Sequence, residues 1–322
     1  MNSYQKMIQK IADAICENVL KEKNYILVGD NSSGKSEVLR KVIERKLGGA
    51  VYFIDSVNRT FDAGKVELRS QSYLHVNLDP RCVITERIAP DRFNLQDSFS
   101  AVGCIEKMYA KYMERLTVMC KDFLEKEICV VRETLEAGLV ENKVLIEGVE
   151  ASLSSGYQAV IRIFCEILYF CDVMEGQKWE KGFVVIDELD EYLSPKYSAK
   201  ILSYLQHQFP ELSFLVTTHS IDLVEASEDV NLIVLKDVNF KIYSSREMGT
   251  AILADDIFTN LFFENRKEHQ SEDDEIDKRL RQLLNLRIAG VWDENAEDEL
   301  RAISAKEILP HQKMICRQIK EW

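Results

Sequence analysis

The stretch that decides the fold is Tyr25-Ile26-Leu27-Val28-Gly29-Asp30-Asn31-Ser32-Ser33-Gly34-Lys35-Ser36, in which a short apolar run leads into a polar loop. Residues 29–36 match the pattern G-x-x-x-x-G-K-[ST] at every fixed position. Apolar residues then recur at helical spacing from 36 to 46. A strand, a tight loop and a helix in this order can surround a phosphate with backbone N–H groups and the helix N-terminus. We therefore predict a phosphate-binding loop.

Six residues of this loop are predicted to hold a nucleotide: Asn31, Ser32, Ser33, Gly34, Lys35 and Ser36. In this pattern the lysine brings a positive charge to the β- and γ-phosphates, and the serine hydroxyl is a ligand of Mg²⁺. The other interpretation of such a run is a Gly/Ser turn that binds nothing. The apolar strand before the loop and the helix after it argue against that interpretation.

A second apolar run, Phe183 to Ile186, ends in two carboxylates, Asp187 and Glu188. Residues at the carboxyl end of a central parallel strand face the bound ligand. We predict that Asp187 holds Mg²⁺, usually through water, and that Glu188 is the general base for the attacking water. Asp-Glu after an apolar strand is also an ordinary strand end, but its place after a phosphate loop favours the catalytic interpretation.

A histidine follows the next apolar run, Leu212 to Val216. A neutral His219 at the end of that strand could sense the γ-phosphate and orient the attacking water. A lone histidine is usually structural. Its position beyond Glu188, again at a strand end, favours a functional role here.

The segment Leu153-Ser154-Ser155-Gly156-Tyr157-Gln158 precedes an apolar run with helical character, Ala159 to Cys171. Taken alone, it is typical of a helix cap, because serine and glycine satisfy the free N–H groups at a helix start. Its place between the phosphate loop and the acidic strand allows a second interpretation.

Along the chain, the order of phosphate loop, signature segment, acidic pair and histidine resembles that of the ABC-class ATPases, whose Leu-Ser-Gly-Gly-Gln signature occupies the position of 153–158. The Thr-Thr-His-Ser sequence at 217–220 and the Ser-Gly-Tyr variant of the signature are similar to the soluble SMC-like and OLD-like (overcoming-lysogenisation-defect) branch, which is widespread in bacterial antiviral systems. The resemblance covers about 24–245.

The resemblance implies a head-to-tail dimer with ATP and Mg²⁺ between the subunits. Ser154, Ser155 and Gly156 of one subunit would face the γ-phosphate held by the phosphate loop of the other. It also implies a dimer-contact loop at 190–195 and a glutamine that binds the metal, for which we choose Gln96 over Gln71. The family's N-terminal adenine-side strands are replaced by a predicted helix, which puts base specificity in doubt. The inserted region is too short for a long coiled-coil arm.

The composition agrees with a globular protein, since 46% of the 322 residues are apolar and 30% are charged. The net charge of −13 disfavours a protein that grips duplex DNA, and leaves nucleic acid to a local groove or a partner. No apolar run approaches the roughly 20 residues of a membrane helix. The eight cysteines form no C-x-x-C pair, which argues against zinc and disulfides and favours a cytoplasmic location.

Alternating strands and helices predict an α/β fold: a mostly parallel P-loop NTPase sheet, a helical lobe inserted between phosphate loop and signature, and a helical C-terminal region. We expect a first helix over 4–22, a helical pattern from about 95 to 150, and an additional strand at 240–243. The division that we predict is 1–96 for the N-terminal helix and phosphate-loop lobe, 97–175 for the helical lobe with the signature, 176–256 for the acidic strand and histidine, and 257–322 for the helical C-terminal region.

The leading hypothesis is an ATPase switch that forms ATP-dependent dimers and acts on a separate effector protein, in bacterial defence against phage. The acidic patch at 272–275 has no companion motif that would make it a nuclease site, so the effector would be another chain. The defence role rests on the resemblance alone. The alternatives are a DNA repair or recombination ATPase, a transporter's nucleotide-binding subunit, and a scaffold that binds ATP with little turnover.

Overall fold

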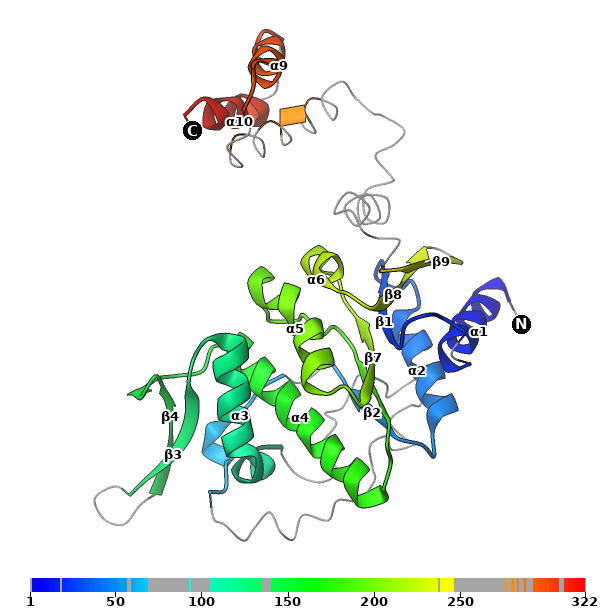
Figure 1. Cartoon of the computed structure of the whole chain (residues 1–322), viewed down its shortest axis with the longest axis vertical. Coiled ribbons are helices and arrows are strands. Elements are labelled where there is room, and N and C mark those ends of the chain that lie inside the picture. Colours follow the sequence, from blue (N-terminus) through cyan, green and yellow to red (C-terminus); the bar gives the residue numbers. More distant parts are fainter. Residues whose placement is uncertain are drawn as a thin grey trace. The chain divides into compact units, whose positions relative to one another are not determined.

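The computed structural model describes residues 2–17, 19–56, 59–68, 93, 105–134, 140–236 and 238–245 and, nearer the C-terminus, 276, 279–280, 283, 287, 292–306 and 310–321. The chain divides into two compact units, Met1–Leu261 and Phe262–Trp322. The elements of both units are labelled in Figure 1. None of the described helices is both long and apolar enough to cross a bilayer.

The first unit is built on a six-stranded sheet in the order β2-β6-β7-β1-β8-β9. Its strands are β1 (Asn24–Gly29), β2 (Val51–Ile54), β6 (Gly182–Ile186), β7 (Leu212–Thr217), β8 (Val230–Lys236) and β9 (Asn239–Ser244). β9 pairs antiparallel with β8, and the other neighbours pair in parallel. β1, β2 and β6 are buried along their whole length because both faces of the sheet are covered. The predicted α/β fold with a mostly parallel sheet is confirmed, and so is the strand at 240–243.

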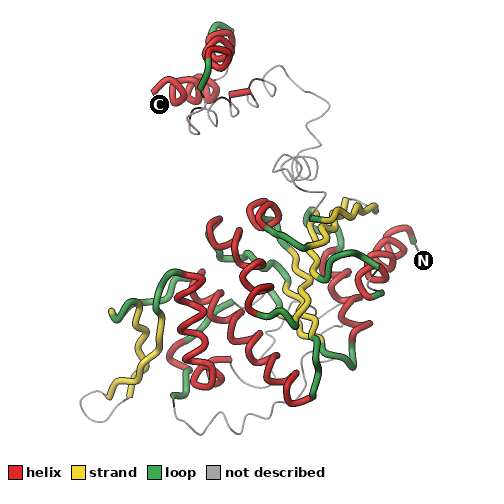
Figure 2. Tube along the Cα trace, viewed as in Figure 1, coloured by secondary structure: helices red, strands yellow, loops and turns green. Residues whose placement is uncertain are grey.

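Helices cover the two faces of this sheet, as Figures 1 and 2 show. α1 (Ser3–Cys16) and α2 (Lys35–Lys46) pack against one face, on a core that includes Tyr25, Leu27 and Phe53. α4 (Ser155–Gln177), α5 (Pro195–Gln208) and α6 (Ile221–Ala226) lie on the other face. There the ring of Tyr52 stacks on that of Phe170, with centroids 5.3 Å apart. Alternate residues of each strand therefore pack against the two helical layers.

The first helix is shorter than the predicted 4–22, because it ends at Cys16. Asn2 caps its start with a capping box, and the chain then returns to begin β1 at Asn24. Val19, which continued the apolar period in the sequence, is 70% exposed. The helical period was therefore accidental beyond residue 16.

The inserted region corrects a second expectation. A short 3₁₀ turn (Ile105–Met108) and α3 (Tyr109–Leu124) are helical as predicted, but 128–150 is not. It forms an antiparallel sheet of β3 (Ile128–Thr134), β4 (Val140–Ile146) and β5 (Val149–Glu150). Ile128 and Val130 are buried while the residues after them are half-buried, which is a period of two. The many charged residues obscured this period in the sequence.

The second unit contains α9 (Glu294–Ser304) and α10 (Pro310–Glu321). Its buried cluster consists of Ile276, Leu280, Leu283, Ala296, Leu300, Ile303, Cys316 and Ile319. All of these come from 276–319, so the described members of this core belong to the second unit alone.

Candidate functional site

The predicted site residues from three strands meet at the carboxyl edge of the sheet. Strand register aligns Ile54 of β2 with Ile186 of β6, and Ile186 with Val216 of β7. Leu27 of β1 pairs with Thr217 of β7, two residues before the phosphate loop begins. The parallel register therefore brings the acidic pair, the residues after β7 and the phosphate loop to one edge, where ligands bind in open α/β sheets.

The phosphate loop folds back on its lysine. Lys35 is buried, and its Nζ donates to the carbonyl oxygens of Gly29 at 2.9 Å and Asp30 at 3.2 Å. Burial lowers the pKa of Lys35, and the charges of Asp187, Glu188 and Asp30 oppose that shift. A buried cation that donates to two loop carbonyls can exchange them for phosphate oxygens without leaving its place.

The backbone of the loop leaves room for an anion. Ser32 and Gly34 adopt left-handed conformations, with φ of +66° and +104°. α2 begins at Lys35 without a side-chain cap, so the first N–H groups of the helix are not taken by a capping side chain. Helix N-termini with free N–H groups attract phosphate. The loop geometry therefore fits the predicted ligand class.

The other predicted loop residues differ in exposure. Asn31, Ser32 and Ser36 are exposed, whereas Ser33 is buried. The Ser33 hydroxyl is turned inward, close to Gly29, and has no hydrogen-bond partner in the described structure. Ser36 can therefore offer its hydroxyl to a metal, while Ser33 supports the loop from inside.

An unforeseen contact joins α1 to the phosphate loop. A Cβ atom on Gly34 would lie 2.6 Å from the Tyr4 hydroxyl oxygen and 2.9 Å from Ile8 Cδ1, both on α1. The loop glycine is thus required by its left-handed backbone and by this packing. Sequence reasoning missed the contact, because nothing in the pattern of residues 3–16 points to a particular partner.

The acidic pair is held by the neighbouring strand. Thr217 donates its hydroxyl to Asp187 Oδ1, and the Thr217 hydroxyl oxygen accepts the N–H of Glu188 at 2.7 Å. Asp187 is only 4% exposed. Glu188 leaves the strand with φ of +52°. No group of three or more His, Cys, Asp or Glu side chains in the described residues could hold a metal. Mg²⁺ fits here nevertheless, because it usually takes one or two protein carboxylates together with waters and phosphates.

His219 lies within the electrostatic reach of this cluster. Burial and the charge of Lys35 lower the pKa of His219, while Glu188 and Asp190 oppose that shift. The turn that carries the histidine is fixed by Ser220, whose N–H donates to Thr218 Oγ1 at 2.8 Å and whose side chain caps α6. Lys35, Glu188 and His219 are therefore brought together, and their catalytic roles stay predictions.

The signature segment forms the start of α4. Ser154 is the N-cap residue, and its hydroxyl oxygen accepts the N–H of Tyr157 at 3.3 Å. Gln158 accepts the N–H of Phe61 at 3.3 Å. A Cβ on Gly156 would lie 2.9 Å from the carbonyl oxygen of Tyr192, in the predicted dimer-contact loop. None of the hydrogen bonds between described residues joins this segment to the phosphate loop of its own chain. Ser155 is exposed in the first turn.

One predicted site residue lies outside the described part of the chain, and two site residues were not predicted. Gln96, and its alternative Gln71, lie outside the described residues. Thr217 was missed as a site residue, although a polar residue directly after an apolar strand was a usable signal. Arg59 was missed because a single arginine between strands carries no signal. It donates from Nη2 to the carbonyl oxygen of Asp187 at 2.7 Å.

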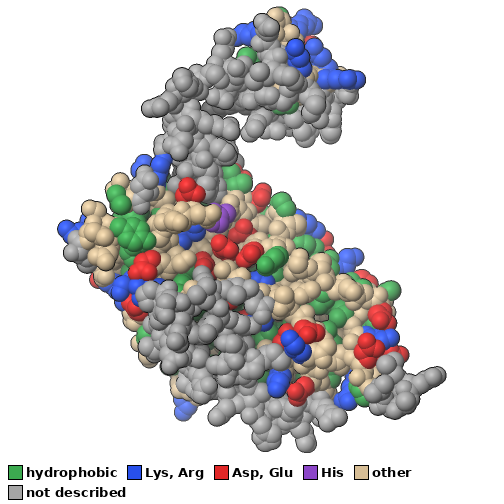
Figure 3. Space-filling view, turned by 180° about the vertical axis from the view of Figure 1, so that it is seen from behind, with side chains coloured by type: hydrophobic (Ala, Val, Ile, Leu, Met, Phe, Trp, Pro, Cys, Tyr) green, Lys and Arg blue, Asp and Glu red, His purple; other side chains and the backbone are tan. Residues whose placement is uncertain are grey.

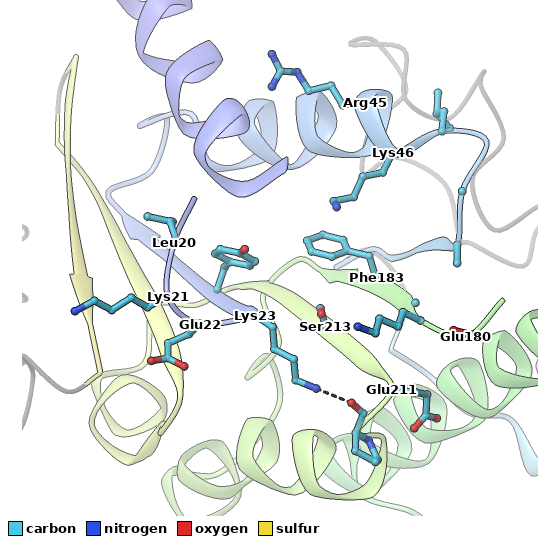
Figure 4. Close-up of a pocket in the computed structure, with 17 residues that line it drawn as sticks. Leu20, Lys21, Glu22, Lys23, Arg45, Lys46, Glu180, Phe183, Glu211 and Ser213 are labelled. Carbon is cyan, nitrogen blue, oxygen red and sulfur yellow. Dashed lines mark hydrogen bonds between the residues drawn. The ribbon is translucent and has the colours of Figure 1, made fainter. Parts of the chain in front are cut away.

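A large cavity lies at the other edge of the sheet, around the amino ends of β1, β6 and β7 (Figure 4). Its volume is about 860 Å³. The Nζ atom of Lys46 sits over the Phe183 ring, 4.2 Å from its centroid. The charged side chains of its lining are Lys21, Glu22, Lys23, Arg45, Lys46, Glu180, Lys181 and Glu211. Ligands of parallel sheets bind at the carboxyl ends of the strands, so this cavity is not the predicted nucleotide site.

Parts of the chain are similar to known bacterial proteins, although no protein-family model matches it. It is 38% identical over 72 residues to the Septu protein PtuA of Bacillus mycoides (strain KBAB4), a match that covers 21% of this chain and 10% of that protein. It is 37% identical over 65 residues to the "Retron Vc95 probable ATPase" of Vibrio cholerae serotype O1 biovar El Tor, covering 20% of this chain and 13% of that protein. The matches thus span a small part of either relative.

Among solved structures, the chain is similar to CbiO1 of Clostridium perfringens, part of an ABC transporter complex, at 15% identity and a TM-score of 0.39. That alignment covers 77% of this chain and 88% of CbiO1. The likeness to ABC-class ATPases of the defence-type branch rests instead on the phosphate loop, the acidic strand end beside it, and the local sequence matches.

Proposed function

We propose that this protein binds and hydrolyses ATP with Mg²⁺, and that ATP joins two copies head to tail. The observation that carries the proposal is the meeting of Lys35, Glu188 and His219 in one charged cluster. The charge of Lys35 lowers the pKa of His219, and the charge of Glu188 opposes that shift. Glu188 also opposes the lowering of the pKa of Lys35. A cation, a base and a neutral imidazole at the carboxyl edge of a parallel sheet are the groups that phosphoryl transfer to water needs.

Each group has a defined task in this proposal. Lys35 and the N–H groups at the start of α2 bind the phosphates. Ser36 and Asp187 hold Mg²⁺, which, when bound, neutralises charge on the β- and γ-phosphate oxygens. Glu188 accepts the proton of the attacking water, and His219 orients that water from the γ-phosphate side. Thr217 keeps Asp187 and Glu188 in register through its hydroxyl.

The dimer and the switch extend the proposal beyond one chain. Ser154, Ser155 and Gly156 stand at the N-terminus of α4, where the helix dipole favours an anion. In the proposed dimer they face the γ-phosphate of the other copy, so hydrolysis weakens the contact. A separate effector protein reads the dimeric state, in bacterial defence against phage. Nucleic acid would be reached through that partner.

The test is the variant Glu188→Gln, compared with Glu180→Gln at the opposite edge of the sheet. Steady-state hydrolysis and sedimentation are measured with ATP and Mg²⁺. Glu188→Gln should lower turnover by at least about 100-fold, because the water loses its general base. It should also accumulate as an ATP-dependent dimer, while Glu180→Gln behaves like the natural protein.

Three outcomes would contradict parts of the proposal. Unchanged turnover in Glu188→Gln removes the assigned base. A persistent monomer with ATP removes the dimer. Tight ATP binding with negligible turnover in the natural protein supports the scaffold interpretation instead.

A further inference from the structure

Arg59 is a fully enclosed cation beside the acidic pair. It is 2% exposed and lies on the segment that follows β2. Arginine is almost never buried in this way unless it is paired, because removing its charge from water is costly. Burial lowers the pKa of Arg59, and four carboxylates oppose that shift: Glu166, Asp55, Asp187 and Glu191. The buried positive charge of Arg59 is therefore stabilised by the negative charges of these carboxylates.

Its direct contact is with the backbone of the acidic strand end. Nη2 donates to the carbonyl oxygen of Asp187 at 2.7 Å. Nε and Nη1 are also buried and have no hydrogen-bond partner in the part of the chain that the structure describes. One strong, charge-assisted hydrogen bond thus fixes the side chain, and it is directed at a peptide group instead of a carboxylate.

That peptide group joins the two predicted site acids and is held from both sides. Its carbonyl, from Asp187, accepts from Arg59, and its N–H, from Glu188, donates to Thr217 Oγ1 at 2.7 Å. Glu188 adopts φ of +52°, a conformation that is unfavourable for a residue with a Cβ atom. A strained backbone of this kind persists where its surroundings determine it. The two hydrogen bonds fix the plane of the peptide from which the Glu188 side chain leaves the sheet.

We propose that Arg59 is a positioning residue for ATP hydrolysis, which acts by clamping the Asp187–Glu188 peptide together with Thr217. The clamp sets the direction of the Glu188 carboxylate relative to Lys35 and His219. This inference rests on the proposed function of Glu188. A misplacement of about 1 Å in a reacting group can cost about 100-fold in rate, so a backbone clamp has a kinetic effect without touching the nucleotide.

The experiment uses the full chain with the variants Arg59→Met, Arg59→Lys and Thr217→Val. Arg40→Met is the matched control, because Arg40 is also a largely buried arginine but pairs with Glu37 and Glu44 on α2. We expect Arg59→Met to lower kcat for ATP hydrolysis by about 10- to 100-fold while KM and ATP affinity stay within about threefold. Arg59→Lys should recover part of the loss, since lysine keeps a donor and the charge.

Combining Arg59→Met with Thr217→Val tests the shared target. Because both residues hold one peptide, the double variant should lose little more than the worse single variant. Independent, additive losses would overturn the clamp. The clamp would also be overturned if Arg59→Met and Arg40→Met had the same kcat, or if Arg59→Met lowered only the affinity for ATP.

Amide hydrogen exchange gives a readout that does not depend on turnover. Arg59→Met should speed exchange in the segment 184–192 several-fold, whereas Arg40→Met should leave it unchanged. If the natural protein does not hydrolyse ATP, the proposed function fails, and the exchange result still decides on the clamp. Equal exchange in Arg59→Met and the natural protein overturns the clamp whether or not ATP is hydrolysed.

Discussion

Glu188 is placed by a backbone conformation that its residue type disfavours. A left-handed φ costs an L-residue about 1–2 kcal/mol, and φ is +52° here. If the strand continued from Ile186 instead, the Glu188 carboxylate would point to one of the two helix-covered faces of the sheet. The left-handed turn ends the strand and directs the chain into Leu189, whose N–H donates to the Thr217 carbonyl at 3.0 Å. The residue to which the pattern assigns catalysis is therefore also a strained one, as is common at functional sites.

The pH dependence of turnover tests the role of His219. Its pKa is lowered by burial and by the charge of Lys35, from an ordinary value of about 6.5. Protonation would place a second cation near Lys35, so the imidazole stays neutral to a lower pH than a free histidine. Turnover at saturating ATP should therefore hold as pH falls through about 6.5 and decline only below it. The measurement is kcat across about pH 5 to 8.

His219→Gln is the control for this pH profile. Glutamine keeps a hydrogen-bonding group that does not titrate, so the decline assigned to the histidine should disappear. Turnover should also fall by about 100-fold, which is the usual effect of losing one preorganised polar group. Identical pH profiles for the two proteins would remove His219 from the mechanism.

At the residue scale, local spacing predicted the parts of the site that follow strands. Lys35, Asp187 and His219 each lie a few residues after an apolar run that forms a strand. Because these strands pair in parallel, the residues that follow them lie at the same edge of the sheet. Arg59 could not be predicted, because its contact with Asp187 joins residues separated by 128 positions and depends on a loop conformation. The contact of Tyr4 with Gly34 was hidden for the same reason.

At the scale of elements, α4 offers a direct test of the signature turn through two of its glycines. Alanine stabilises a helix interior by about 1 kcal/mol relative to glycine. At Gly176, in the last turn of α4, a Cβ would meet nothing within 4 Å, so Gly176→Ala should raise the free energy of unfolding by up to about 1 kcal/mol. At Gly156 a Cβ would lie 2.9 Å from the Tyr192 carbonyl oxygen, so Gly156→Ala should lower it.

Urea denaturation of both variants measures this difference within one helix. The sign is the deciding quantity, because both substitutions are the same chemical change. Equal stabilisation by the two alanines would mean that the 190–195 loop does not rest on the start of α4. In that case the loop and the signature would be free to move apart in the proposed dimer.

Strands that are buried on both faces could be predicted from the sequence, but strands that are buried on only one face could not. The apolar runs of β1, β2 and β6 are buried on both faces and stand out in the sequence. β4 is largely half-buried or exposed, with Lys143 paired to Glu133 and Glu150 across the strands. Charged residues at cross-strand positions are easily mistaken for the polar face of a helix, because single-sequence periodicity cannot show what lies opposite.

At the scale of the whole molecule, the charge distribution restricts the partners. The net charge is −13, and Figure 3 shows acidic and basic side chains interspersed over the described part of one face. A field of this sign repels a polyanion at long range. The basic side chains that line the cavity of Figure 4 lie among Glu22, Glu180 and Glu211. The whole-molecule field thus favours a protein partner over direct contact with nucleic acid in the proposed switch.

The two units allow one further prediction, because their described cores do not share residues. The sheet core that contains Tyr25, Leu39 and Val185 belongs to Met1–Leu261. The predicted nucleotide residues, from Asn31 to His219, lie in that unit too. A chain that ends at Leu261 should therefore keep the ATP affinity of the full chain and unfold in one cooperative transition, because a compact unit with its own core can fold alone.

Calorimetry measures the ATP affinity of the full chain and of the chain that ends at Leu261, and thermal unfolding measures the cooperativity of both. A shortened chain that binds ATP equally well but no longer forms the ATP-dependent dimer would assign assembly to Phe262–Trp322. A shortened chain that loses ATP affinity, or that unfolds without cooperativity, would mean that the sheet core depends on the second unit. The prediction would then be wrong, since it depends on all the phosphate-binding groups and the whole of their supporting core lying before residue 262.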